Sequence, residues 1–272
     1  MPNETAVSLE CVGVSHAFAS SDAPVLSNLS VRVSRGEFVA LVGASGCGKT
    51  TLLRILAGLI RPERGAIRLG GSDVTGITAH GRAMVFQGDR LFPWMSALDN
   101  VLFGLEIRRM PRAEALPRAR SALELVGLKD WASVYPSELS GGMRQRVNVA
   151  RALVVEPDFL LMDEPFASLD AQTREIMQRE LLRILAHTNA GVVFVTHQIE
   201  EALYLSDRVI VMGSRPGRVR DEVQVPLLRP RSLESKRDPA FQELHARIWK
   251  AIEADVLASV LPAGAAAASA SR

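Results

Sequence analysis

The chain has 272 residues, 47% of them hydrophobic, a composition that supplies a buried core for one large domain or two small ones. Its net charge of +2 gives no indication of binding to nucleic acid or to anionic lipid, and its two cysteines, Cys11 and Cys47, favour free thiols in a reducing compartment. The N-terminus lacks the pattern of a signal peptide and no apolar run approaches the ~18 residues that cross a bilayer, so we expect any membrane association to go through another protein.

Three short runs rich in β-branched residues, at 7–12, 29–33 and 38–42, predict strands at the start of the chain. The third run leads into GASGCGKT at 43–50, which fits the phosphate-binding pattern G-x-x-x-x-G-K-[ST]. The following residues predict a helix, whose unpaired N–H groups would face the ligand. We therefore predict a polyphosphate site in which Lys49 reaches the terminal phosphates and Thr50 holds Mg²⁺. This motif alone leaves other P-loop folds open.

The stretch from 88 to about 155 contains no convincing strand, and 112–126 has helical spacing of Ala, Leu and Val. We interpret it as an inserted helical subdomain. Within it, Ser140-Gly141-Gly142 directly precedes a second amphipathic helix, so this helix start is another candidate anion site. Taken alone, Ser140 would be interpreted as a helix N-cap.

Strands resume at 159–162 and 192–195, each followed by a helix, the alternation expected of parallel βαβ units. The first of them ends in Asp163 and Glu164, two carboxylates that suit Mg²⁺ and a water molecule. We predict an α/β fold with a mixed or parallel sheet core and an antiparallel β edge. The predicted domains are 1–225 for nucleotide binding with the helical insertion at about 88–155, 226–261 for a helical extension, and 262–272 for a disordered tail.

This order of motifs resembles the nucleotide-binding cassette of ABC transporters over about residues 7–225. The resemblance implies a P-loop NTPase fold and ATP hydrolysis with Mg²⁺. It also implies that Asp163 supports Mg²⁺ through its water shell and that Glu164 polarises the attacking water. Gln87 would contact Mg²⁺ and the water, and His197 would touch the γ-phosphate. Without the motif order, Gln87 would be interpreted as a surface residue and His197 as an ordinary strand-end histidine.

The resemblance further implies a set of nucleotide-binding residues: Phe18, Gly43, Ala44, Ser45, Gly46, Cys47, Gly48, Lys49, Thr50, Thr51, Ser140, Gly141, Gly142 and Asp170. Phe18 stands where the family has an adenine-stacking aromatic, more often Tyr, and core packing is its alternative role. Met143 replaces the glutamine that is usual in the family's signature. Asp170 lies in a segment that resembles one crossing between cassettes, and it could equally cap the next helix. Cys47 lies near a helix N-terminus and Lys49, a setting that can favour the thiolate, so we expect ATP to protect it from alkylation.

Two anion-binding helix starts, after Gly48 and after Gly142, are too many for one nucleotide in one copy. The resemblance implies two cassettes packed head to tail, most simply a homodimer, which closes on ATP binding and reopens on hydrolysis. The apolar residues of 88–96 could bind a helix of a membrane partner or pack within the chain. This segment, 214–219 and 237–249 resemble importer cassettes that serve nitrate, sulfonates and taurine.

We therefore expect an ABC-type transport ATPase of an importer, peripheral on the cytoplasmic face of the inner membrane. Its expected partners are integral membrane permease subunits, bound through the loop after Gln87, and an extracytoplasmic solute-binding protein, with no nucleic acid. The alternative is a soluble ABC ATPase that is not coupled to transport, which would have two cassettes or a long coiled-coil insertion. A P-loop kinase would leave 139–142 and His197 without a role. The solute stays open among sulfonates, nitrate, taurine and thiamine precursors.

Overall fold

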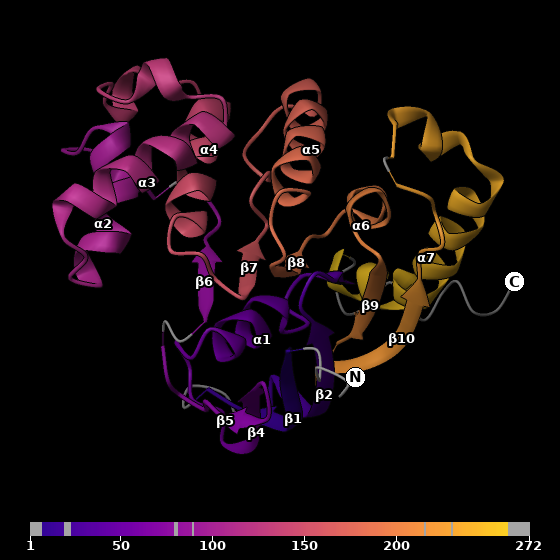
Figure 1. The fold of residues 1–272 in the computed structure, drawn as a ribbon. Helices are drawn as coiled ribbons and strands as arrows, with labels where there is room; N and C mark the ends of the chain where they lie inside the picture. Colours follow the sequence, from indigo (N-terminus) through magenta and orange to yellow (C-terminus); the bar gives the residue numbers. More distant parts are fainter. Residues whose placement is uncertain are drawn as a thin grey trace, which may run out of the picture. The chain divides into compact units, whose positions relative to one another are not determined.

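The computed structural model describes residues 7–18, 23–78, 81–88, 90–214, 216–229 and 231–260 (Figure 1). The chain divides after Thr78 and after Val192 into two compact units. We call the unit built from the two ends of the chain the terminal unit, and the unit from Ala79 to Val192 the middle unit. Among the described helices, none combines the length and apolar character needed to cross a membrane.

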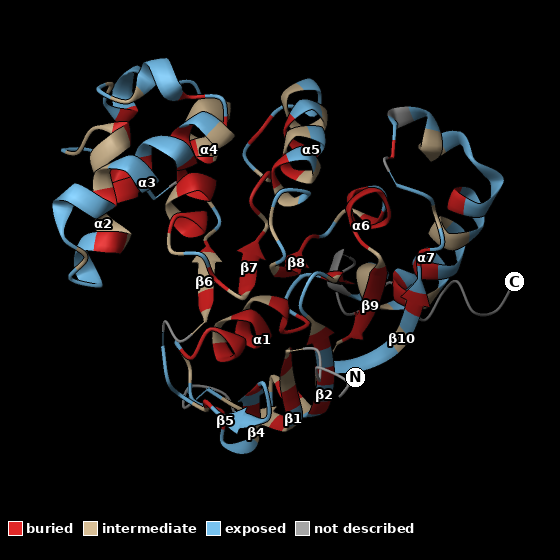
Figure 2. Ribbon diagram, viewed as in Figure 1, coloured by how far each residue is buried: buried red, intermediate tan, exposed pale blue. Residues whose placement is uncertain are grey.

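The terminal unit begins with a four-stranded antiparallel sheet in the order β2-β1-β4-β5. Its strands are β1 (Ser8–His16), β2 (Leu26–Ser34), β4 (Arg64–Leu69) and β5 (Ser72–Asp73). In β2 the buried residues Leu29, Val31 and Val33 alternate with residues facing outward, the period-two pattern of a sheet with one covered face (Figure 2). This sheet is the predicted antiparallel β edge.

A second sheet of the terminal unit has the strand order β10-β9-β3-β8. Its strands are β3 (Phe38–Gly43), β8 (Gly191–Val195, of which the last three residues belong to this unit), β9 (Arg208–Gly213) and β10 (Arg218–Gln224). β3 and β9 are parallel and wholly buried, whereas β9 and β10 are antiparallel and β10 is mostly exposed. The helical elements of this unit are α1 (Lys49–Leu56), α6 (Ile199–Leu205), η3 (Leu233–Arg237) and α7 (Pro239–Val260).

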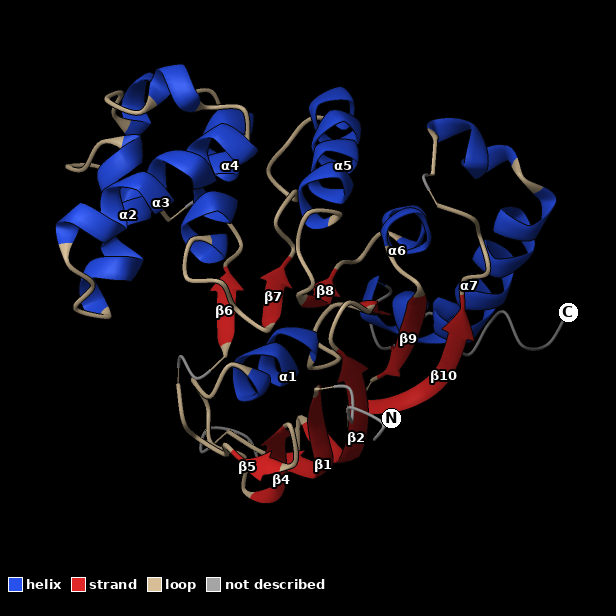
Figure 3. Cartoon of the chain, in the orientation of Figure 1, coloured by secondary structure: helices blue, strands red, loops and turns tan. Residues whose placement is uncertain are grey.

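The middle unit contains two parallel strands, β6 (Arg82–Val85) and β7 (Phe159–Asp163), and a group of helices (Figure 3). The helical elements are α2 (Ala97–Ile107), α3 (Arg112–Leu125), η1 (Lys129–Trp131), η2 (Pro136–Glu138), α4 (Gly141–Leu153) and α5 (Ala171–Leu185). Helices α2, α3 and α4 contact one another, and each has buried apolar residues, such as Val101, Ala119 and Val147. The described residues between β6 and β7 contain no strand.

The observed elements confirm the predicted fold class, an α/β fold with mixed strand directions, an antiparallel sheet and a helical segment between β6 and β7. The middle unit is larger than the predicted helical insertion, because it also includes β6, β7 and α5. The domain boundaries given above stay a prediction. The tail at 262–272 lies outside the described residues.

Candidate nucleotide and hydrolysis site

The phosphate loop of the terminal unit connects β3 directly to α1, as predicted. Gly48 caps α1 with a φ of 98°, in the left-handed region, and a Cβ there would lie 2.6 Å from a methyl carbon of Leu26. A Cβ on Gly43 would lie 2.5 Å from the carbonyl oxygen of Met212. Both glycines of the motif are therefore required by close packing behind the loop.

Lys49 is 6% exposed and its ammonium lies within the loop. Its Nζ donates to the carbonyl oxygens of Gly43, at 2.8 Å, and Ala44, at 3.1 Å. The loop thus combines one cation with the N-terminal N–H groups of α1. This donor set fits a polyphosphate.

Cys47 is buried within the same loop, with its sulfur 3.8 Å from Lys49 Nζ. Burial raises the pKa of the Cys47 thiol above its ordinary value, and the attraction of Lys49 for the thiolate opposes this rise without cancelling it. The expectation that this setting favours the thiolate is therefore wrong. The sequence showed the neighbouring charge but not the burial, which has the larger effect.

His197 follows β8, the strand next to β3 in the sheet, and its side chain is exposed. The backbone N–H of Thr196 donates to the carbonyl oxygen of Leu41 in β3, at 3.2 Å. The terminal unit therefore places the phosphate loop and His197 after neighbouring strands. Sequence reasoning missed the supporting pair here: the buried Thr196 hydroxyl donates to the carboxylate of Glu201, which is also buried.

Phe18 lies just after β1 and is 41% exposed, so it is not a core residue. Its ring packs edge-on against the imidazole of His16, with the ring centroids 4.9 Å apart. The exposed part of the ring is available for stacking on a base.

In the middle unit, β6 and β7 run parallel with Val85 paired to Met162. Gln87 and Glu164 therefore both lie two residues beyond this pair, at the same edge of the strands. Asp163 is 4% exposed at the end of β7, and Glu164 has a φ of 43°. The unit thus brings an amide and two carboxylates to one edge.

Ser140 and Asp170 both cap helices of the middle unit, which are the alternative roles weighed above. Ser140 Oγ accepts from the N–H of Met143 at 3.3 Å, and Gly141 and Gly142 open α4. Asp170 Oδ1 accepts from the N–H groups of Gln172 and Thr173, and the Thr173 hydrogen bonds lower the pKa of Asp170. Ser140 is exposed, so the start of α4 remains accessible to a ligand or to another copy of the chain.

The predicted Mg²⁺ ligands Thr50, Gln87 and Asp163 belong to two units, the first to the terminal unit and the others to the middle unit. Among the described residues, no group of three His, Cys, Asp or Glu side chains could hold a metal ion. The hydroxyl, amide and carboxylate oxygens of Thr50, Gln87 and Asp163 nevertheless fit Mg²⁺, because in nucleotide sites this ion takes most of its ligands from phosphate and water.

The sequence matches the family described as ABC transporter over residues 26–167. An uncharacterized ABC transporter ATP-binding protein of Methanocaldococcus jannaschii is 46% identical over 243 residues, which are 89% of this chain and 90% of that one. A taurine import ATP-binding protein of Pseudomonas aeruginosa is 44% identical over 242 residues, 86% of this chain and 91% of that one.

A solved structure described as a dimeric post-hydrolysis state of an ATP-binding cassette, bound to ADP and Pi, has a similar fold. The TM-score is 0.68 and the identity 29%, with 81% of this chain and all of that chain covered. These similarities confirm the resemblance that the motifs indicated. The chain belongs to the ABC transporter family, as one of its ATP-binding subunits that hydrolyse ATP.

Proposed function

We propose that this chain is the ATPase subunit of an importer for a small sulfonate of the taurine type, and that it works as a homodimer. The observation that carries this proposal is the 44% identity to a taurine import ATP-binding protein over most of both chains. The same relative supports the permease subunits and the extracytoplasmic solute-binding protein as partners. It also supports a peripheral position on the cytoplasmic face of the membrane.

In the proposed site, the ammonium of Lys49 and the N-terminal N–H groups of α1 bind the β- and γ-phosphates. Thr50, Gln87 and Asp163 would hold Mg²⁺, which when bound neutralises charge on the phosphates. Glu164 orients the attacking water and polarises it, and His197 donates a hydrogen bond to the γ-phosphate. Phosphoryl transfer to water demands mostly positioning and charge stabilisation, so these roles account for the chemistry.

A second copy would complete each site through the start of α4. Ser140 is exposed, and the half-buried Gly141 and Gly142 begin α4, at the positive end of the helix dipole. The relative with a similar fold is described as a dimer bound to ADP and Pi. Each copy would thus present Ser140 to the nucleotide that the other copy holds with Lys49.

Contact with the permease is proposed for the segment after Gln87. Trp94 is 70% exposed, and its ring lies 5.6 Å from that of Phe92, which packs on Phe103 of α2. Buried Asn100 holds this segment to α2 by accepting from the Phe92 N–H and donating to the carbonyl oxygens of Phe92, Met95 and Ser96. A firmly held, exposed indole is typical of a protein–protein contact.

The transport proposal is tested by uptake of labelled taurine into cells that lack this gene. We expect uptake to be lost, and to return with the natural chain but not with Lys49→Ala. Nitrate uptake measured in the same cells distinguishes the other substrate class. Undiminished taurine uptake in the deleted strain would contradict the assignment to a taurine-type sulfonate.

A further inference from the structure

Helix α6 is short and almost wholly buried, and it begins two residues after His197. Its buried residues are Ile199, Glu201, Ala202, Leu203, Tyr204 and Leu205. Seven residues form too few internal hydrogen bonds to hold a helix by themselves, so its position depends on the groups that hold its ends.

The N-terminal end of α6 is held next to His197. The Thr196 hydroxyl donates to the carboxylate of Glu201 and accepts from the Gln198 N–H at 3.0 Å. Because Thr196 also bonds to Leu41 of β3, the backbone is fixed on both sides of His197. A shift of α6 would therefore act on the backbone that carries the imidazole through Gln198 and through the hydrogen bond between Thr196 and Glu201.

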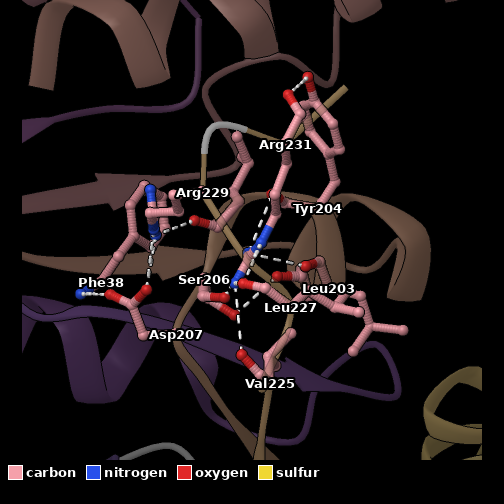
Figure 4. A network of polar contacts seen from close by, with 11 residues as sticks. Phe38, Leu203, Tyr204, Ser206, Asp207, Val225, Leu227, Arg229 and Arg231 are labelled. Atoms are coloured by element: carbon pink, nitrogen blue, oxygen red, sulfur yellow. Dashed lines mark hydrogen bonds and ion pairs between the residues drawn. The ribbon is translucent and has the colours of Figure 1, made fainter. Parts of the chain in front are cut away.

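The C-terminal end of α6 is held by Arg231, which is 6% exposed (Figure 4). Its Nη1 donates to the carbonyl oxygens of Leu203 at 3.0 Å, Tyr204 at 3.1 Å and Ser206 at 2.6 Å. Its Nη2 donates to the carbonyl oxygens of Val225 and Leu227, at 3.4 and 3.3 Å. A cation at a helix C-terminus is favourable, because the last carbonyl oxygens carry partial negative charge.

Burial lowers the pKa of Arg231 to about 10, and its positive neighbour Arg229 acts in the same direction. The guanidinium therefore stays protonated at neutral pH. Arg231 is a buried cation that donates to five carbonyl oxygens. Loss of some of these hydrogen bonds would cost much free energy, so the position of the guanidinium is tightly defined.

A second set of hydrogen bonds joins the C-terminal end of α6 to β3, the strand that leads into the phosphate loop. Arg229 donates to Asp207 Oδ1 at 2.8 and 3.0 Å and to the carbonyl oxygen of Leu205 at 2.9 Å. Asp207 Oδ2 in turn accepts from the Phe38 N–H at 2.9 Å (Figure 4). Arg229 and Asp207 thus connect the end of α6 to the start of β3.

We propose that Arg231 is a positioning residue for His197: by fixing the C-terminal end of α6, it sets where the other end of the helix presents the imidazole. The inference rests on the proposed contact of His197 with the γ-phosphate. Arg231 lies beyond the nucleotide-binding domain predicted at 1–225. A segment outside the phosphate-binding motifs would therefore tune recognition of the γ-phosphate.

The test compares affinities for ATP and ADP in the full-length chain, measured by competition with a fluorescent nucleotide. Only ATP carries the group that His197 would touch. We expect Arg231→Met to weaken ATP binding about tenfold, which corresponds to the loss of one good interaction, while ADP binding changes less than about twofold. Arg231→Lys, which keeps the charge but not the fork of donors, should fall in between. Arg247→Met is the matched control, because Arg247 binds Asp221 elsewhere in the same C-terminal region.

The decisive comparison is with His197→Ala. If Arg231 acts through His197, the double variant should keep the ATP-to-ADP affinity ratio of His197→Ala alone. Equal weakening of ATP and ADP binding by both Arg231 variants would show that Arg231 only holds the fold together, and would overturn the inference. If His197→Ala itself leaves the ratio unchanged, the proposed role of His197 fails as well. If His197→Ala lowers the ATP-to-ADP affinity ratio and Arg231→Met leaves it unchanged, only the inference about Arg231 is overturned.

Discussion

Cys47 is a residue whose reactivity depends on burial more than on the charge beside it. Its side chain is 1% exposed, and burial raises the pKa of its thiol, so little thiolate exists at neutral pH. We predict that maleimide labels the protein at least about tenfold more slowly than a free cysteine at pH 7, and faster as the pH rises. Saturating MgATP should slow labelling further, because Cys47 lies within the loop that holds the phosphates. Equal labelling rates with and without nucleotide would contradict the placement of the phosphates.

Glu164 is the residue on which the proposed hydrolysis depends most. Glu164→Gln keeps the size and shape of the side chain and removes its ability to act as a base. We predict a fall in kcat of about 10²- to 10⁴-fold with little change in ATP affinity. Phosphate release measures the first quantity and nucleotide competition the second. A variant that turns over at the natural rate would remove Glu164 from its proposed role.

At the scale of elements, α7 is attached to the edge strand β10 by ion pairs. Arg247 donates to both carboxylate oxygens of Asp221, at 2.8 and 2.9 Å, and Arg220 pairs with Asp255 at 3.0 Å. The Arg247 side chain is 54% exposed, so solvent screens the first pair and weakens its contribution to stability. These contacts set the orientation of the helix more than they stabilise it.

The pair Asp221–Arg247 predicts a pH dependence. Hydrogen bonding from Arg247 lowers the pKa of Asp221, so its stabilisation is complete above the pKa of an unfolded aspartate and is lost as the pH falls through the lower, folded value. We predict that Asp221→Asn slightly reduces the free energy of unfolding in urea at pH 7. The difference from the natural chain should shrink as the pH falls from about 5 to about 3. A difference that stays constant over this range would show that the pair contributes nothing as an ion pair.

The sequence predicted several of the strands whose pattern reflects burial, although β9, which is also wholly buried, was not predicted. β3, β7 and β8 read as continuous apolar runs because both faces of each strand are covered. Strand β4 begins with the exposed residues Arg64-Gly65, although it lies between β1 and β5 and buries Ile67 and Leu69. Strand β10 is a mostly exposed edge strand and carries four charged residues in seven, so its structure depends on pairing with β9. Neither was predicted. Propensity is weak where an edge strand faces water.

Prediction of the site from the sequence was limited in a similar way. The phosphate loop could be proposed because its motif is local in sequence, and Asp163 and His197 could be proposed because the order of the motifs resembles a known family. The role of Arg231 could not be predicted, because its partners are carbonyl oxygens of two separate segments, 203–206 and 225–227, that only folding brings together. A lone arginine in a proline-rich stretch gives no sign of burial.

In the proposed homodimer, one copy of the chain cannot hydrolyse ATP by itself. Lys49 and His197 belong to the terminal unit, whereas Gln87, Glu164 and Ser140 belong to the middle unit. In the proposed homodimer, each nucleotide would meet Lys49 of one copy and Ser140 of the other. The Lys49 and the Ser140 of one site would then come from different copies of the chain, so each copy can lack one of them without lacking the other.

The most direct measurement is therefore ATP hydrolysis by a mixture of two inactive variants, Lys49→Ala and Ser140→Arg. Equal mixing makes about half of the dimers mixed, and each mixed dimer has one intact site and one doubly defective site. We predict recovery of up to about a quarter of the natural activity, since one site in two works in half of the dimers. Two separately purified Lys49→Ala preparations, mixed in the same way, should recover none. Activity no higher than that of the two variants measured alone would contradict the account.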